Sequence, residues 1–246
     1  MEVTGFPDGQ PTKVGISLAD VNAGNLAFEG ILLALFQREQ TGKGQHVDIS
    51  LLDGLLSLFT YQSQIALSSK NKVTRKGNRH PTITPYETFA TKDGFINVAV
   101  GTELHWKNFC NALKLDELMR DGRFTTNSKR VEHRLALERL LTPKMKKRYS
   151  KEWINILSHA DVPCGTINTL NEALRLKTVA ERSMIATVHH PTIGIFRMVN
   201  NPLKLSGMLY QRNLSPPLLG EHTNAILKQI GCTTLQIASF KKRGVI

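Results

Sequence analysis

The feature that most constrains the fold is an alternation of strand-like and helical apolar runs over residues 1–70. A short apolar run at 14–19 precedes a longer run at 26–36 with helical spacing, and Thr41-Gly42-Lys43-Gly44 is typical of a helix end. An alternating stretch at 45–50 predicts a strand, and the apolar run at 51–67 predicts another helix. Strands and helices in turn are typical of α/β domains, so we expect an α/β fold.

The pattern changes after residue 84. Strands are predicted at 86–91 and 95–100, around the strong hairpin signal Lys92-Asp93-Gly94. Helices are predicted at 103–113, 130–147 and 150–159, a strand at 163–168, a short helix at 171–176, strands at 185–189 and 194–199, and a last helix at 224–230.

Four segments follow from these patterns. We expect an α/β segment at 1–70, a linker or loop at 71–84, a small α+β domain at 85–180 and a C-terminal segment at 181–246.

The charge balance constrains the partners. The 246 residues include 32 Lys and Arg against 20 Asp and Glu, a net charge of +12, which attracts anions. The basic residues are scattered, and no zinc-finger or aromatic RNA-binding pattern accompanies them, so we expect no nucleic-acid partner. A phosphate-bearing cofactor or a carboxylate substrate fits the charge equally well.

Cysteine and histidine spacing argues against a metal. Cys110, Cys164 and Cys232 are far apart, and no histidine pair at i, i+4 has a third ligand in view, so we expect no metal and no disulfide framework. The longest unbroken apolar runs are shorter than a bilayer span, and no leader-like segment opens the sequence. We therefore expect no membrane segment and no targeting signal.

Asp20 is the first candidate site residue. It stands between the apolar runs at 14–19 and 26–36, where an aspartate is favoured as a helix N-cap. The positive end of a helix also keeps a carboxylate ionised, as an acyl-transfer nucleophile must be. Local spacing favours the cap and leaves both interpretations open.

The second candidate is the polar segment Gly77-Asn78-Arg79-His80-Pro81. A glycine-containing polar loop between two domains is a typical place for a lid over a binding site. A plain linker explains the same composition equally well.

Taken together, the chain resembles the class III CoA-transferases. The resemblance rests on Asp20 with Gly24, on Thr41-Gly-Lys-Gly-Gln-His-Val-Asp48, on Gly77-Asn-Arg-His-Pro81, on Thr91-Lys-Asp-Gly94 and on Pro217-Leu-Leu-Gly-Glu-His-Thr223, in the family's order. It implies that Asp20 is the nucleophile and that Gly77, Asn78, Arg79 and His80 contribute to binding substrate or CoA. The family's Rossmann-like first half has no counterpart here, so we expect a truncated form or fragment with an incomplete large domain. The family builds that domain from both ends of the chain, so the resemblance implies that residues 1–70 are its remainder and that residues 181–246 return to it.

The resemblance also implies an activity and a setting. We expect CoA, as succinyl-CoA, to be the co-substrate, and a dicarboxylic acid such as glutarate or hydroxymethylglutarate to be the acceptor. The family forms interlocked homodimers, and its similar animal members are mitochondrial. Two alternatives stay open: a non-catalytic truncated subunit, and an acyl-CoA racemase of the same family that moves an α-proton.

Overall fold

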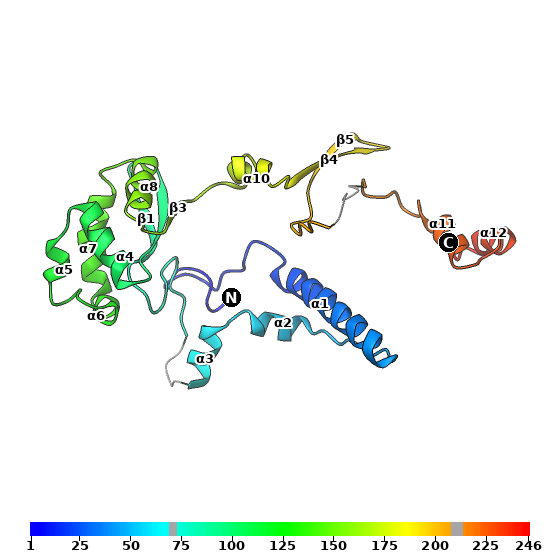
Figure 1. Cartoon of the computed structure of the whole chain (residues 1–246), viewed down its shortest axis with the longest axis horizontal. Coiled ribbons are helices and arrows are strands. Elements are labelled where there is room, and N and C mark those ends of the chain that lie inside the picture. Colours follow the sequence, from blue (N-terminus) through cyan, green and yellow to red (C-terminus); the bar gives the residue numbers. More distant parts are fainter. Residues whose placement is uncertain (69–72, 208–213) are drawn as a thin grey trace. The chain divides into compact units, whose positions relative to one another are not determined.

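The structure, a computed structural model, describes residues 1–68, 73–207 and 214–246 (Figure 1). It divides into two compact units, Met1–Ile167 and Asn168–Ile246. The four segments drawn from the sequence remain a prediction. Residues 69–72, which span the predicted boundary between the segment at 1–70 and the linker at 71–84, lie outside the described residues.

The first unit opens with an irregular coil followed by a long helix, α1 (Leu18–Thr41). Gly42 ends this helix with a left-handed φ of 70°, and its amide donates to the Arg38 carbonyl at 2.8 Å, which confirms the predicted helix end. α2 (Leu51–Ser57) packs against α1, and α3 (Tyr61–Ser68) follows. The single helix predicted at 51–67 is wrong, because Thr60 takes a φ of 45° and separates two short helices.

The two strands predicted before residue 70 do not form. Residues 43–50 have no regular structure, and the end of the 14–19 run belongs to α1 instead. A strand needs a partner for its backbone hydrogen bonds, and no strand of the described chain lies beside either run. Local alternation carries no information about such a partner.

A three-stranded antiparallel sheet begins the second part of this unit. β1 (Tyr86–Ala90) pairs with β2 (Phe95–Ala99), which confirms the predicted hairpin, and β2 pairs with β3 (Cys164–Thr166). Along β1 every second residue is buried, so Glu87 and Phe89 share the face that turns toward the core.

Helices cover this sheet and enclose the main core. α4 begins where the Thr102 hydroxyl accepts the His105 amide at 3.0 Å. The helix predicted at 130–147 starts earlier and is interrupted at His133. The five helices are α4 (Glu103–Leu113), α5 (Glu117–Arg120), α6 (Asn127–Glu132), α7 (Arg134–Met145) and α8 (Ser150–His159).

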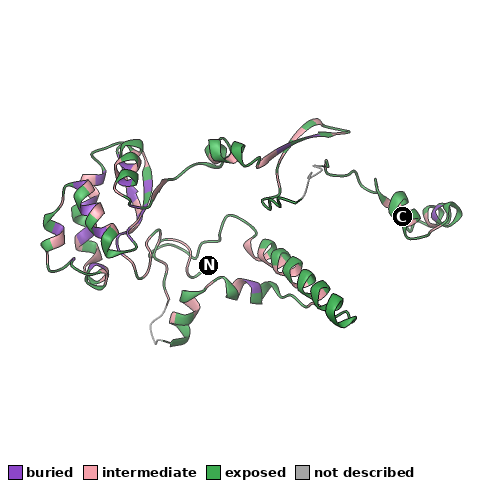
Figure 2. Cartoon of the chain, viewed as in Figure 1, coloured by how far each residue is buried: buried purple, intermediate pink, exposed green. Residues whose placement is uncertain are grey.

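Most of the buried apolar residues lie in this sheet and helix module, from Phe89 to Val162 (Figure 2). Trp106 and Trp153 are the largest of them, and both are almost fully buried. The module therefore has a core of its own.

The second unit contains two short helices, a hairpin and a helix pair. The two strands predicted at 185–189 and 194–199 are confirmed, and the structure pairs them as an antiparallel hairpin. The last predicted helix is followed by a further one. Its elements are α9 (Leu170–Ala173), α10 (Lys177–Glu181), β4 (Ile185–His190), β5 (Gly194–Val199), α11 (Thr223–Gln229) and α12 (Thr234–Lys242).

α1 differs from the other helices in its exposure. No residue of α1 is buried, and apolar side chains such as Leu33 and Phe36 are about two-thirds exposed, at 68% and 66%. Contrary to the expectation from the sequence, α1 is long and apolar enough to span a bilayer by length and composition, with a mean hydropathy of 1.3. Core helices of larger domains meet the same test, and Glu29 near the centre of α1 would be costly in hydrocarbon.

Candidate active site

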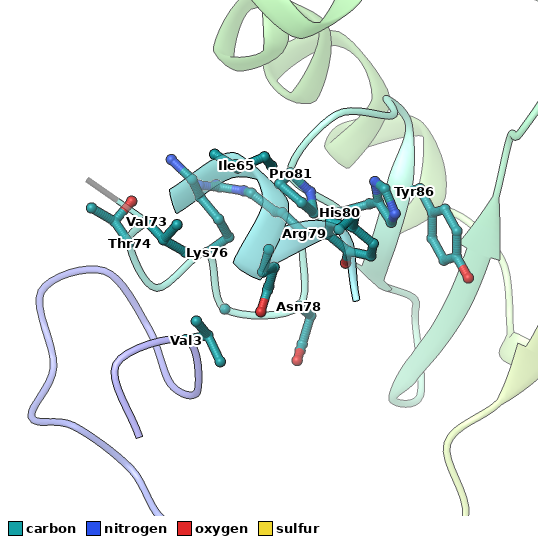
Figure 3. Close-up of a pocket in the computed structure, with 13 residues that line it drawn as sticks. Val3, Ile65, Val73, Thr74, Lys76, Asn78, Arg79, His80, Pro81 and Tyr86 are labelled. Carbon is teal, nitrogen blue, oxygen red and sulfur yellow. The ribbon is translucent and has the colours of Figure 1, made fainter. Parts of the chain in front are cut away.

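The residues predicted to bind substrate line one hollow of about 380 Å³ (Figure 3). Its walls come from the N-terminal coil, α3, residues 73–81 and the first residue of β1. We call residues 77–81 the Gly77 loop. Four of its members are the predicted site residues, which the structure brings together here: Gly77, Asn78, Arg79 and His80.

Gly77 makes the turn that opens this loop. Its φ is +62°, and its amide donates to the Gly5 carbonyl at 2.9 Å. A Cβ added at Gly77 would lie 2.8 Å from the Phe6 ring. Both the left-handed conformation and the close approach require glycine at this position.

Arg75 ties the N-terminal coil to the same turn. Its guanidinium donates to the Gly9 carbonyl at 2.8 Å and to the Phe6 carbonyl at 3.3 Å. The coil that leads into α1 is thus anchored on the segment that leads into the Gly77 loop.

His80 is held between two aromatic rings. Its imidazole stacks on Tyr86 with a centroid distance of 5.0 Å and lies 5.5 Å from Tyr61. Burial, together with the positive charge of Arg134, lowers the pKa of His80. The imidazole is therefore neutral at pH 7. The Thr82 amide donates to Nδ1 at 3.2 Å, which leaves the ring proton on Nε2 as a hydrogen-bond donor.

Two cations of this segment differ in what they can offer a ligand. Arg79 is committed to the protein, because it donates to Glu138 Oε2 at 2.7 Å. Lys76 lines the same hollow, is exposed, and forms no ion pair with any described residue. Lys76 can therefore bind an anionic group, while the Arg79 side chain fixes the loop.

Three side chains of α6 and α7 hold the backbone that follows the loop. Asn127 donates to the Thr82 carbonyl at 2.8 Å and accepts from the Thr84 amide at 3.1 Å. Arg134 donates to the His80 carbonyl at 2.7 Å. The third is Arg130, which donates to the Thr84 carbonyl at 2.9 Å. The loop is thus fastened at both ends.

Asp20 lies in the first turn of α1 and is exposed. The N-cap position belongs to Ser17, and no hydrogen bond from the Asp20 side chain caps the helix, so the cap interpretation is wrong. Asp20 lines a separate hollow of about 240 Å³, to which Lys13 also contributes. The structure therefore does not place Asp20 in the hollow of the Gly77 loop. Val3 borders one hollow and Thr4 the other, so the N-terminal coil runs past both.

Sequence reasoning missed several residues of this region. Tyr61 and Tyr86 had no signal, because their pairing with His80 depends on the tertiary fold. Glu87 did have a sequence signal. It stands two residues before Phe89 in a predicted strand, so its carboxyl group is expected on the same core-facing side as the Phe89 ring.

The described residues offer neither a metal-binding cluster nor a reactive thiol at Cys110. No group of three or more His, Cys, Asp or Glu side chains among the described residues could hold a metal ion. Burial raises the pKa of the Cys110 thiol to about 12, so it is not a nucleophile at neutral pH.

Comparison with known proteins identifies relatives along almost the whole chain. It is 30% identical over 230 residues to succinyl-CoA:glutarate CoA-transferase of Mus musculus, covering 94% of this chain and 53% of that protein. It is 31% identical to succinate–glutarate CoA-transferase of Agrobacterium fabrum, covering 94% of this chain and 58% of that one. The chain thus spans about half the length of the curated relatives it matches.

Solved structures agree with this relationship. A CaiB/BaiF family protein from Brucella suis is 32% identical and superimposes with a TM-score of 0.75, covering 93% of this chain and 59% of that chain. A protein from Mycobacterium tuberculosis, 21% identical over 89% of this chain and 58% of that one, shares the fold with a TM-score of 0.76. These likenesses confirm the predicted α/β fold class.

The profile of CoA-transferase family III matches residues 1–223, a span that holds Asp20 as well as the Gly77 loop. The chain therefore belongs to CoA-transferase family III.

Proposed function

We propose that this chain supplies the nucleophile of an enzyme that moves CoA from succinyl-CoA to a dicarboxylic acid such as glutarate or hydroxymethylglutarate. The observation that carries the proposal is the family match over residues 1–223, which includes Asp20 in the exposed first turn of α1. Relatives named for glutarate, oxalate and mesaconate support a dicarboxylic acceptor.

The proposed reaction proceeds through covalent intermediates on Asp20. A carboxylate oxygen of Asp20 attacks the thioester carbon of succinyl-CoA, and the CoA thiolate leaves, which gives a mixed anhydride. The thiolate then attacks the aspartyl carbonyl, releases succinate and forms an aspartyl-CoA thioester. The acceptor carboxylate displaces the thiolate to give a second anhydride. The thiolate finally attacks the acceptor carbonyl and restores the Asp20 carboxylate.

The Gly77 loop and the residue that precedes it offer two groups suited to this chemistry. The neutral imidazole of His80 can donate from Nε2 to a carbonyl oxygen, and the exposed ammonium of Lys76 can pair with a carboxylate or a phosphate. We propose that Gly77, Asn78, Arg79 and His80 form part of the binding site, with Arg79 acting through its hold on the loop.

Replacement of the nucleophile tests the proposal. Asp20→Ala should lower CoA transfer by at least about a thousandfold, because no covalent intermediate can form. Asp53→Ala is the matched control, since Asp53 is also an exposed aspartate in the first turn of a helix and should leave transfer unchanged.

Isotope transfer gives a second measurement. With an acceptor labelled with ¹⁸O in its carboxylate, one label should pass to Asp20, and mass spectrometry of the peptide that contains Asp20 should detect it. Undiminished transfer in Asp20→Ala would overturn the assignment. Solvent deuterium at the acyl α-carbon without a second CoA ester would instead support a racemase.

A non-catalytic role is the second candidate. It is favoured by α1, which carries the nucleophile but buries none of its side chains in this chain. Titration of the chain with CoA distinguishes the two roles, because a subunit that only associates with other chains should not bind CoA. The mitochondrial location and the interlocked homodimer stay predictions from the family resemblance.

A further inference from the structure

The proposed reaction leaves unexplained a pair of carboxyl groups beneath the Gly77 loop. Glu87 lies on the core-facing side of β1 and is only 6% exposed. Glu138 faces it from α7, with 16% of its side chain exposed. Acidic residues are rarely buried unless they are paired.

Two arginines accompany the pair. Arg79 bridges it, at 2.7 Å from Glu138 Oε2 and 3.7 Å from Glu87 Oε2. Arg134 lies one turn before Glu138 on α7, and its charge acts on both carboxyl groups. Oε1 of Glu87 and Oε1 of Glu138 are buried and have no hydrogen-bond donor among the described residues.

One proton held by the pair explains how two buried carboxyl groups can face each other. Two carboxylates have no donor to offer each other, whereas one protonated carboxyl group can donate to the other, which would give a partner to the buried Oε1 atoms of Glu87 and Glu138. Burial, followed by the charge of Glu138 and this hydrogen bond, raises the pKa of Glu87 to about 7, although Arg134 and Arg79 oppose the shift. The pair therefore holds one proton below neutral pH and loses it above.

We call Glu87, Glu138, Arg79 and Arg134 the carboxyl cluster, and it has few other charged neighbours. The Gly77 loop adds the neutral His80, whose pKa Arg134 lowers. Lys76 and Asp8 border the same hollow of about 350 Å³ as Glu87. Neither forms an ion pair with the carboxyl groups among the described residues.

The carboxyl cluster binds the Gly77 loop and the residues that follow it through one side chain and through backbone carbonyl groups. The Arg79 side chain is bound to Glu138, and Arg134 donates to the carbonyls of His80 at 2.7 Å and Ile83 at 3.1 Å. We propose that the Glu87 and Glu138 pair positions the Gly77 loop for substrate binding, and that the loop is fixed only while the pair holds one proton. This inference rests on the binding role proposed above for the loop.

The sign of the pH effect follows from linkage. A carboxyl group that binds its proton more tightly in the closed cluster favours the closed form below its raised pKa, and this advantage is lost as pH rises through about 7. Opening of the loop should therefore increase as pH rises toward about 7 and become independent of pH above that value.

Hydrogen exchange of the loop measures this opening without reference to activity. The amides of Gly77, Arg79 and His80 are hydrogen-bonded, so their exchange, corrected for intrinsic rates, reports how often the loop opens. In the full chain, protection of these amides should fall by up to about tenfold for each pH unit between about 4.5 and 7 and level off above 7, because only in that range does the closed loop keep a proton that the open loop has lost.

Two variants test the contribution of each carboxyl group separately. Glu87→Gln stays neutral and can still donate to Glu138, so its loop should remain protected and independent of pH between about 5 and 8. Glu138→Gln removes the partner of Arg79, so protection should drop by at least about tenfold at every pH. Its remaining pH dependence should shift to lower pH, because the like charge that raises the pKa of Glu87 is gone. Glu132→Gln, at an exposed position on α6, is the control and should match the original chain.

Transfer kinetics give the functional reading. The KM for the CoA thioester should rise with pH in the original chain and stay level in Glu87→Gln, with little change in kcat. Equal loop exchange in Glu138→Gln and the original chain, or the same pH profile in Glu87→Gln, would overturn the inference. If the loop amides show the predicted pH-dependent hydrogen exchange but the chain transfers no CoA, only the proposed function is contradicted.

Discussion

Arg130 shows how one side chain can join the core to the candidate site. It is only 1% exposed and donates to Glu103, to the Phe124 carbonyl and to the Thr84 carbonyl. Its guanidinium also lies 4.8 Å from the centre of the Trp106 ring. A cation is tolerated inside this module because nearly every donor has a partner.

Removal of this cation should be costly. Arg130→Met should lower the free energy of unfolding by about 2 to 4 kcal/mol, because three acceptors lose their donor. Urea unfolding followed by tryptophan fluorescence would measure it, since Trp106 and Trp153 both belong to the module. Arg139→Met, at an exposed position on α7, is the control and should change stability by less than about 0.5 kcal/mol. Equal effects of the two substitutions would contradict the structural role of Arg130.

At the scale of elements, the contact of α1 with α2 and with the residues between them depends on glycines. A Cβ at Gly30 would lie 2.7 Å from a methyl carbon of Val47, and a Cβ at Gly54 would lie 3.2 Å from the Asn22 side chain. Asn22 donates to the Gly54 carbonyl at 2.8 Å. The close approach therefore needs small residues.

Two alanine substitutions in α1 should act in opposite directions. Gly24→Ala should stabilise the helix by about 0.5 to 1 kcal/mol, because Gly24 is helical and has open space around it. Gly30→Ala gains the same helix propensity but must displace Val47, so it should be destabilising overall. Thermal unfolding followed by circular dichroism at 222 nm would compare them. A gain in stability for both would mean that the packing on Val47 is loose.

The elements also show what sequence can predict. The hairpin around Asp93 and the helices that begin at Glu103 and Ser150 were predicted well, because turn residues and apolar spacing are local signals. The strand predicted at 45–50 failed because pairing depends on a distant partner. In the site, the loop residues were found as a contiguous motif. The Glu87 and Glu138 pair was missed because the two are brought together only by the packing of α7 on β1.

At the scale of the whole molecule, burial is distributed unevenly. The main core lies between Phe89 and Val162, whereas α1 has no buried residue although most of its residues 26–36 are apolar. Long apolar helices are usually enclosed by other elements. Among the described residues, α1 packs against α2 and Val47.

Hydrogen exchange along the chain should reflect this distribution. Amides of β2, α4 and α8 should be protected on the order of a hundredfold more than those of α1 in dilute solution, because only the former need the core to open. Mass spectrometry of exchanged peptides would compare them across protein concentrations. Protection of α1 equal to that of α4 at the lowest concentration would show that α1 is covered.

The anchoring of the N-terminal coil has a consequence for mutational tolerance. Arg75 and Gly77 hold the coil through the carbonyl oxygens of Gly5, Phe6 and Gly9, which every amino acid possesses. In a library of single substitutions, side-chain identity at Gly9 can therefore vary freely, while Arg75 and Gly77 cannot. The arginine side chain that fixes the path of the coil into α1 therefore lies about 70 residues further along the sequence than the coil itself.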